Sequence, residues 1–307
     1  MLRAFAVGGA LTIAAGGLAA AQTEIIVRSV MASVSDADGR PILGLHPDDF
    51  LVEVNGAALV ALEAAPARYP LVLIIDTSTA ARELLTRLRA PLRRFAERSV
   101  LSPMSLVTFG DTPVFAVKFT EDARRISRGI EGLFARPDTA GYLLDGLHRV
   151  AQEVTRLEVP VVDAVVITVA PFDASRRDPD KVISELVKSR VRVHIVAERP
   201  HVLGTVPTPA PRSPRSVSAA DMLLYASREQ GALLNDLSAA SGGSFQQVDL
   251  VSGLAGALQR IHERHLGEYV VGFEAPRVPM KDEALRLRVN LPGARVTLTP
   301  LSSSARR

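Results

Sequence analysis

Residues that could hold a divalent cation follow the most apolar segment of the chain. The unbroken apolar run of residues 71–75 ends in Asp76, and Thr77, Ser78 and Thr79 come directly after it. A run of this kind predicts a strand that is buried on both faces of a parallel sheet. The carboxyl end of such a strand lies at the rim of the sheet, where open α/β folds bind their ligands. Because carboxylate and hydroxyl oxygens are the ligands that Mg²⁺ and Ca²⁺ prefer, the segment is a candidate metal-binding loop.

A second pair of potential metal ligands occurs near the end of the chain. His262 and His265 stand three residues apart in a segment whose apolar spacing predicts a helix. This spacing differs from the H-E-x-x-H pattern of zinc-binding helices, and no third ligand is evident. We interpret the pair as the solvated end of a helix. The chain also has no G-x-S-x-G segment and no glycine-rich phosphate loop.

The composition excludes several kinds of chemistry. The 307 residues include no cysteine, which excludes disulfides, a thiol nucleophile and thiolate zinc sites. The apolar fraction of 47% is sufficient for a large core. The net charge of +3 is small, the basic residues are scattered and tryptophan is absent, so we expect no nucleic-acid partner.

The amino-terminal residues 1–21 have the pattern of a signal peptide. A basic start at Arg3 precedes a run of small apolar residues, and Ala19, Ala20 and Ala21 fit the small-x-small cleavage rule. The alternative is a segment that is retained as a membrane anchor. We expect cleavage before Gln22 and a secreted or periplasmic protein with no stable membrane span after removal of the signal.

From Pro70 onward, apolar strands alternate with amphipathic helices. We expect strands at residues 71–75, 104–109, 114–119, 161–169, 191–197 and 244–248. We expect helices at residues 81–98, 121–134, 142–157, 179–189, 219–238 and 250–265. Repeated β-then-α units predict an α/β fold with a doubly wound, mostly parallel sheet and helices on both faces.

Three local signals refine this pattern. Pro91 should kink or divide the helix in which it lies, and Thr120 should cap the start of the following helix. Residues 199–218 are rich in proline and hold few large apolar side chains. We expect this segment to be an exposed or disordered loop.

Both ends of the mature chain have the character of β-strands. Residues 24–35 and 51–54 are strand-like and are followed by the turn Asn55-Gly56, and residues 285–291 alternate leucine with arginine. The two flanks are therefore expected to form one small β-sandwich-like module beside the α/β domain.

The motif segments resemble those of von Willebrand factor A domains. That family carries D-x-S-x-S after the first strand of its sheet, and here Asp76 and Ser78 match while Ala80 stands at the second serine. Thr139 stands where the family has a threonine on a second loop. On the third loop the family has Asp-Gly, whereas this chain has Val169 and an alanine.

The flanks resemble those of an exported bacterial subset of this family. Its leader has the pattern D-x-x-G-x-P-V-x-G-L-x-x-x-D-F-x-V-x-x-x-G. The matching positions are Asp36, Gly39, Pro41, Ile42, Gly44, Leu45, Asp49, Phe50, Val52 and Gly56. Its tail has Y-x-x-G-Y, which is matched by Tyr269 and Gly272, with Phe273 in place of the second tyrosine.

This resemblance implies four segments in the chain. They are a signal peptide at 1–21, a β segment at 22–66, a von Willebrand A-like (Rossmann-like) domain at 67–266 that includes the loop 199–218, and a β segment at 267–307.

The resemblance also implies a non-enzymatic protein-binding or adhesion-type module with a degenerate metal-ion-dependent adhesion site. The remaining ligands would be Asp76, Ser78 and Thr139, which predicts either no cofactor or weakly bound Mg²⁺. Asp173 lies four residues beyond the missing carboxylate and is a possible substitute. A different function, a hydrolase that uses Asp76, Asp138 and Asp173, is the alternative. If the chain is a binding module, its partner is a protein whose identity the sequence does not specify.

Overall fold

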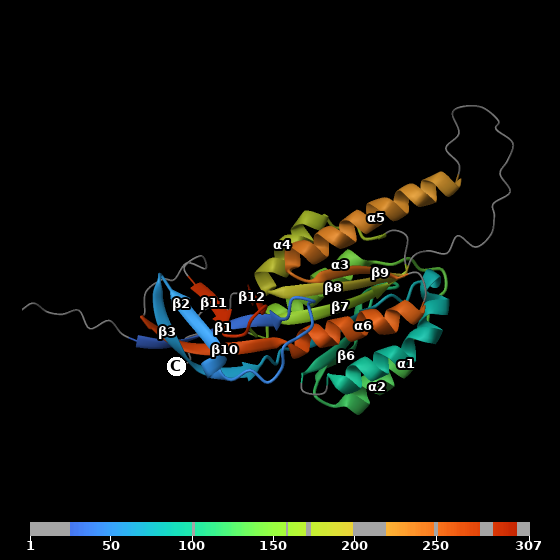
Figure 1. The fold of residues 1–307 in the computed structure, drawn as a ribbon. Helices are drawn as coiled ribbons and strands as arrows, with labels where there is room; N and C mark the ends of the chain where they lie inside the picture. The colour runs from blue at the N-terminus through green and yellow to red at the C-terminus, as the bar shows by residue number, and fades with distance from the viewer. Residues whose placement is uncertain are drawn as a thin grey trace, which may run out of the picture.

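The computed structural model describes residues 25–99, 102–157, 159–169, 173–198, 219–248, 251–276 and 285–299. The expected signal peptide and the proline-rich loop lie outside these residues. Two six-stranded sheets, one mostly parallel and one antiparallel, form the framework (Figure 1).

The mostly parallel sheet has the strand order β6-β5-β4-β7-β8-β9. Its strands are β4 (Leu71–Ile75), β5 (Met104–Thr108), β6 (Val114–Thr120), β7 (Val162–Thr168), β8 (Val191–Glu198) and β9 (Ser244–Val248). Only β6, at one edge, runs antiparallel to its neighbour. Taken in chain order, the strands follow the 3-2-1-4-5-6 arrangement of doubly wound folds, in which the strand order reverses between β4 and β7.

Helices cover both faces of this sheet, as the β-then-α pattern predicts (Figure 1). They are α1 (Arg82–Arg98), α2 (Ala123–Glu131), α3 (Leu143–Thr155), α4 (Pro179–Ser189), α5 (Ala219–Ser241) and α6 (Val251–Leu266). Alternate residues of β4 separate the two cores: Leu73 packs with residues of α1, α2 and α6, and Ile74 packs with residues of α3, α4 and α5. Successive side chains of the strand point to opposite faces of the sheet, so β4 contributes to both cores.

The antiparallel sheet joins the two ends of the described chain, in the order β11-β2-β3-β10-β1-β12. Its strands are β1 (Ile25–Ser35), β2 (Phe50–Val54), β3 (Ala57–Pro66), β10 (Glu268–Pro276), β11 (Leu285–Val289) and β12 (Arg295–Thr299). Strand β3 pairs with β2 through its first half and with β10 through its second half. The end strands β11 and β12 lie close to each other, so this is one curved sheet around an apolar core.

The ends and the course of several helices differ from the sequence expectations. Helix α1 continues through Pro91 as a single 17-residue helix, so the proline does not divide it. Helix α2 begins two residues later than expected, and Asp122 caps it by accepting hydrogen bonds from the backbone N–H groups of Arg124 and Arg125. The hydroxyl of Thr120, which was expected to cap this helix, instead accepts the backbone N–H of Asp122 over 3.1 Å. A carboxylate accepts the backbone N–H groups at a helix start more strongly than a neutral hydroxyl does, because the helix start carries a partial positive charge. This favours the aspartate over the threonine as the cap.

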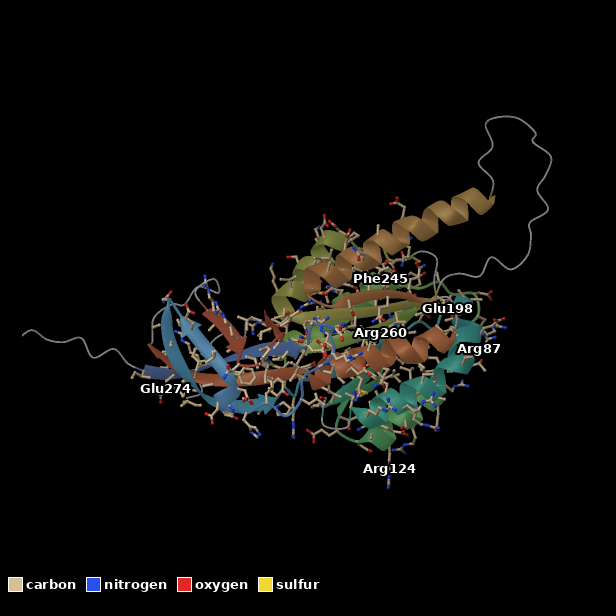
Figure 2. The ribbon with its side chains drawn as sticks, viewed as in Figure 1. Arg87, Arg124, Glu198, Phe245, Arg260 and Glu274 are labelled. Carbon is tan, nitrogen blue, oxygen red and sulfur yellow. The ribbon has the colours of Figure 1, made fainter. Side chains whose placement is uncertain are left out.

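Charged side chains lie on the outward faces of α1, α2 and α6 (Figure 2). Arg87 and Arg124 extend away from α1 and α2 in Figure 2, and Arg260 lies on α6. Within the part of the chain that the structure describes, no helix combines the length and the apolar character needed to cross a bilayer.

Candidate functional site

The candidate loop lies at the point where the strand order reverses. Asp76 follows β4, and its side chain is fully buried. One carboxylate oxygen, Oδ1, accepts the backbone N–H of Ser78 over 2.9 Å. The other, Oδ2, accepts the hydroxyl of Thr168 over 2.9 Å and the backbone N–H of Val169 over 3.2 Å. Asp76 therefore ties the end of β4 to the end of β7 at the point of strand-order reversal, where doubly wound folds place their ligands.

The hydroxyls next to Asp76 have different surroundings. Thr77 Oγ1 accepts the backbone N–H of Gly110 over 3.1 Å. Ser78 Oγ is buried and has no hydrogen-bond partner among the described residues. A buried hydroxyl without a partner costs free energy, and such groups in native proteins are usually satisfied by water or by an ion. Within the described structure, Ser78 is thus the candidate ligand whose side-chain oxygen makes no hydrogen bond to the protein.

The second loop is fastened directly to the first. The backbone N–H of Thr139 donates to Thr79 Oγ1 over 3.1 Å, and the N–H of Thr79 donates to the carbonyl of Thr139 over 3.2 Å. The hydroxyls of both threonines donate to the carbonyl of Arg136, each over 3.0 Å. The structure therefore places the Thr139 loop beside the Asp76 loop, while the Thr139 hydroxyl is directed to its own loop.

The two other rim carboxylates have separate surroundings. Asp138 is exposed and has a left-handed backbone with a φ of 56°. Asp173 Oδ1 accepts the backbone N–H of Leu143, at the start of α3, over 2.6 Å and the hydroxyl of Ser175 over 3.1 Å. Burial raises the pKa of Asp173, and its hydrogen bonds offset only part of that rise. Asp173 thus stabilises the start of α3.

A shallow groove beside the rim was not foreseen from the sequence. It has a volume of about 650 Å³ and lies between the β5–β6 turn and α3. Its lining residues are Asp111, Thr112, Pro113, Tyr142, Asp145, His148, Arg149, Gln152 and Arg177. None of Asp76, Asp138 and Asp173 belongs to this lining. The groove residues come from separate segments of mixed polarity, so no sequence motif marks them.

The interpretation of His262 and His265 as a solvated helix end is wrong for His265. Its side chain is 12% exposed, and its Nε2 lies 2.7 Å from Oδ2 of the fully buried Asp163. His194 approaches the same oxygen. The three residues are far apart in the sequence and become neighbours only because β7, β8 and α6 meet at the amino-terminal edge of the sheet. The sequence offered one usable signal, which was the presence of charged and histidine residues inside two otherwise apolar strands.

The comparisons with known proteins find structural similarity without sequence-level matches. No family model matches the chain, and a search of curated proteins finds no match. A von Willebrand factor type A structure from Catenulispora acidiphila is 11% identical, with a TM-score of 0.49, over 90% of this chain and 73% of that one. The vWF domain of the type V pili tip protein Mfa5 from Porphyromonas gingivalis is 11% identical, with a TM-score of 0.45, over 65% and 95%. The conserved hypothetical protein BatB from Bacteroides thetaiotaomicron is 12% identical, with a TM-score of 0.47, over 64% and 98%.

The chain is thus similar to von Willebrand factor A proteins in its motif segments, and proteins of that name are among its structural neighbours. At these identities and scores, the similarities assign no ligand, partner or residue role to this chain.

Proposed function

We propose that the chain is an exported, non-enzymatic protein-binding module of the von Willebrand A type, and that its partner docks on the rim formed by the loops of Asp76 and Thr139. The observation that carries this proposal is the way the two loops are joined. Their backbones are cross-linked by hydrogen bonds, and Thr79, Ala80 and Asp138 are left exposed on the outer side. A rigid, exposed loop surface at the strand-order reversal is where this fold class presents binding residues.

The metal site in this proposal is degenerate. Asp76 is the only carboxylate in the set Asp76, Ser78 and Thr139, and its oxygens already accept the hydrogen bonds described above. Mg²⁺ prefers about six oxygen ligands and is usually held by one or two carboxylates. Of the three side chains, Ser78 alone has an oxygen without a hydrogen bond to the described residues, whereas the Thr139 hydroxyl donates to the carbonyl of Arg136. Recognition of the partner would then depend on the shape and polarity of the rim, with no cofactor or with only weakly bound Mg²⁺.

The observations favour binding over hydrolysis by Asp76, Asp138 and Asp173. Asp76 is fully buried and accepts hydrogen bonds from Thr168 and Val169, and Asp173 accepts the backbone N–H of Leu143 at the start of α3. A general base has to reach its substrate through a cleft, and the groove near the rim contains none of the three. A catalytic role for this set would require a rearrangement of the buried Asp76 and of the partly buried Asp173.

The proposal includes export to the periplasm or the medium and a division of the chain into the segments 1–21, 22–66, 67–266 and 267–307. The antiparallel sheet supports a module built jointly from both flanks, because β10 of the last segment pairs with β1 and β3 of the first. A sandwich-like arrangement of this module is part of the proposal.

The experiment is capture of the partner with a rim variant and a matched control. Ala80→Arg adds a long charged side chain to an exposed rim position, and Ala90→Arg adds the same side chain to an exposed position on α1. The immobilised wild type is expected to retain a specific protein from the envelope fraction of its own source. Ala80→Arg should weaken that binding at least about tenfold, which corresponds to about 1.4 kcal/mol, and Ala90→Arg should leave it unchanged.

Two results would contradict the proposal. Equal binding by both variants would exclude the rim as the docking surface. Asp173→Asn removes the carboxylate but still supplies an oxygen that can accept the N–H of Leu143. A hydrolytic activity that disappears in this variant would favour the enzymatic alternative.

A further inference from the structure

A buried cluster of polar side chains lies at the opposite edge of the parallel sheet, away from the rim. Asp163 and His194 come from the first halves of β7 and β8, and His265 comes from the last turn of α6. Figure 1 shows that α6 leads into β10 at this edge, where the two sheets meet. Asp163 and His194 are fully buried, and His265 is 12% exposed.

Each of the three side chains places one potential ligand atom in the same small region of the structure. His194 Nε2 lies 3.2 Å from Asp163 Oδ2, and His265 Nε2 lies 2.7 Å from the same oxygen. All three potential ligand atoms lie within 4.8 Å of one another. Tetrahedral zinc sites with ligand distances of about 2.0–2.2 Å place neighbouring ligand atoms at separations of this order.

The outer contacts are those that a histidine ligand requires. The Nδ1 atom of His194 lies 2.9 Å from Ser244 Oγ, which leaves Nε2 directed at the cluster. Metal-bound histidines usually have such a partner on the second ring nitrogen. Asp163 is held in place by Arg192, whose Nε and Nη2 donate to Oδ1 and Oδ2 over 2.5 and 2.9 Å. The ligand orientations are therefore fixed before any ion arrives.

The net charge of the buried groups around the cluster is negative, which favours a bound cation. The two buried carboxylates of Asp163 and Glu268 face one buried guanidinium, that of Arg192, so these three groups sum to one negative charge. Arg264 is partly exposed and approaches Glu268, at 3.9 Å, from the outer side.

We propose that Asp163, His194 and His265 form a binding site for a divalent transition-metal ion of the Zn²⁺ type. Two imidazole nitrogens and one carboxylate oxygen suit Zn²⁺ or Co²⁺ and are a poor set for Mg²⁺ or Ca²⁺. The partly exposed side of His265 is the entry path and the position for a water as fourth ligand. The ion links β7 and β8 to α6, and through α6 to the antiparallel sheet, so it acts as a staple between the two sheets.

The test uses untagged full-length protein that has been stripped with a chelator. Zn²⁺ is expected to raise the Tm with saturation at one ion per chain, and Co²⁺ is expected to produce the intense visible absorption of a tetrahedral site. His265→Gln keeps an N–H donor for Asp163 but is a poor ligand, and it should weaken Zn²⁺ binding at least about tenfold. His262→Gln, on the same helix, is the matched control and should bind like the wild type.

Two further variants distinguish binding at this cluster from binding at the rim and from a loss of folding. His194→Gln should lose binding to a similar extent, which covers the case in which His265→Gln does not fold. Asp76→Ala should leave the Zn²⁺ response intact, because the rim lies at the other end of the sheet. Absence of a saturable response in the wild type would overturn the proposal. A response that survives both His265→Gln and His194→Gln would overturn it as well.

Discussion

Asp76 shows how a carboxylate at the rim of the sheet can serve the structure of the loops around it. Its two oxygens accept hydrogen bonds from Ser78, Thr168 and Val169, which lie on both sides of the strand-order reversal. A carboxylate with several N–H and O–H donors is stable without a metal ion. Positions 80 and 169 are alanine and valine, which offer no side-chain oxygen to a cation.

Mg²⁺ is therefore expected to leave the thermal stability of the wild type unchanged at millimolar concentration. A ligand at one hundred times its dissociation constant would add about 2.7 kcal/mol, which is easily measured as a shift in Tm. The double substitution Ala80→Ser and Val169→Asp restores one hydroxyl and one carboxylate. It should create a saturable Mg²⁺ shift in differential scanning fluorimetry.

Two outcomes would contradict this account of the rim. One is a saturable Mg²⁺ shift in the wild type that Asp76→Ala abolishes. The other is a folded double variant that gains no shift. In the second case the alignment of the third loop would be in error, and Asp173 would be the next carboxylate to test.

The loops at the rim depend on one close backbone approach. Gly110, after β5, donates its N–H to Thr77 Oγ1, and a Cβ atom at this position would lie 2.1 Å from the carbonyl carbon of Thr77. Only glycine allows this approach. The same contact helps to hold the loop that carries Asp76 and Ser78 against the sheet.

Gly110→Ala should consequently destabilise the protein by about 1–3 kcal/mol, the range for overpacking at a tight site. Gly231→Ala in α5 is the control, because an added Cβ there meets no atom within 4 Å. This second change should be neutral or stabilising by up to about 1 kcal/mol, since alanine favours a helix. Urea denaturation measures the free energy of unfolding of both variants. Equal changes in the two would show that the approach of Gly110 to Thr77 does not constrain the residue at this position.

The two sheets of the molecule are joined by a buried network of charged side chains. Glu268, the first residue of β10, accepts hydrogen bonds from Arg192 of β8, each over 2.9 Å, and from the hydroxyl of Tyr69 over 2.6 Å. The guanidinium of Arg192 also lies 5.0 Å from the ring centre of Tyr69. Burial, together with Asp163 and Glu268, raises the pKa of Tyr69 well above 10.0, so its hydroxyl stays a donor.

Loss of one carboxylate from this network should weaken the whole molecule. Glu268→Ala leaves part of the Arg192 guanidinium and the Tyr69 hydroxyl without an acceptor, at a cost of about 3 kcal/mol, within the range for breaking a buried pair. Glu274→Ala is the control, because Glu274 is exposed further along the same strand (Figure 2). It should change the free energy of unfolding by less than about 0.5 kcal/mol. Similar losses in both variants would show that the network does not hold the sheets together.

Local patterns were sufficient for most strands and helices of the α/β part and for its mostly parallel, doubly wound class, but they did not mark β3 or specify the strand order. Runs such as Leu71–Ile75 predict buried strands because a strand between two helical layers is apolar on both faces. The alternation of strands and helices then limits the topology, because crossovers between parallel strands are right-handed. The position of Asp76 at the rim follows from the same reasoning. Pro91 does not divide α1, because the packing of the helix outweighs the loss of one backbone hydrogen bond.

Contacts between distant segments were decided by the tertiary structure alone. Asp163, His194 and His265 lie in strands and a helix whose own periodicity does not indicate their neighbours, and a single histidine pair on α6 looks solvated without them. The donors from Thr168 and Val169 that engage Asp76 come from the end of a strand far along the chain, at separations of 92 and 93 residues. Periodicity reports which face of an element is buried, whereas the partner of a buried polar group depends on how the elements pack.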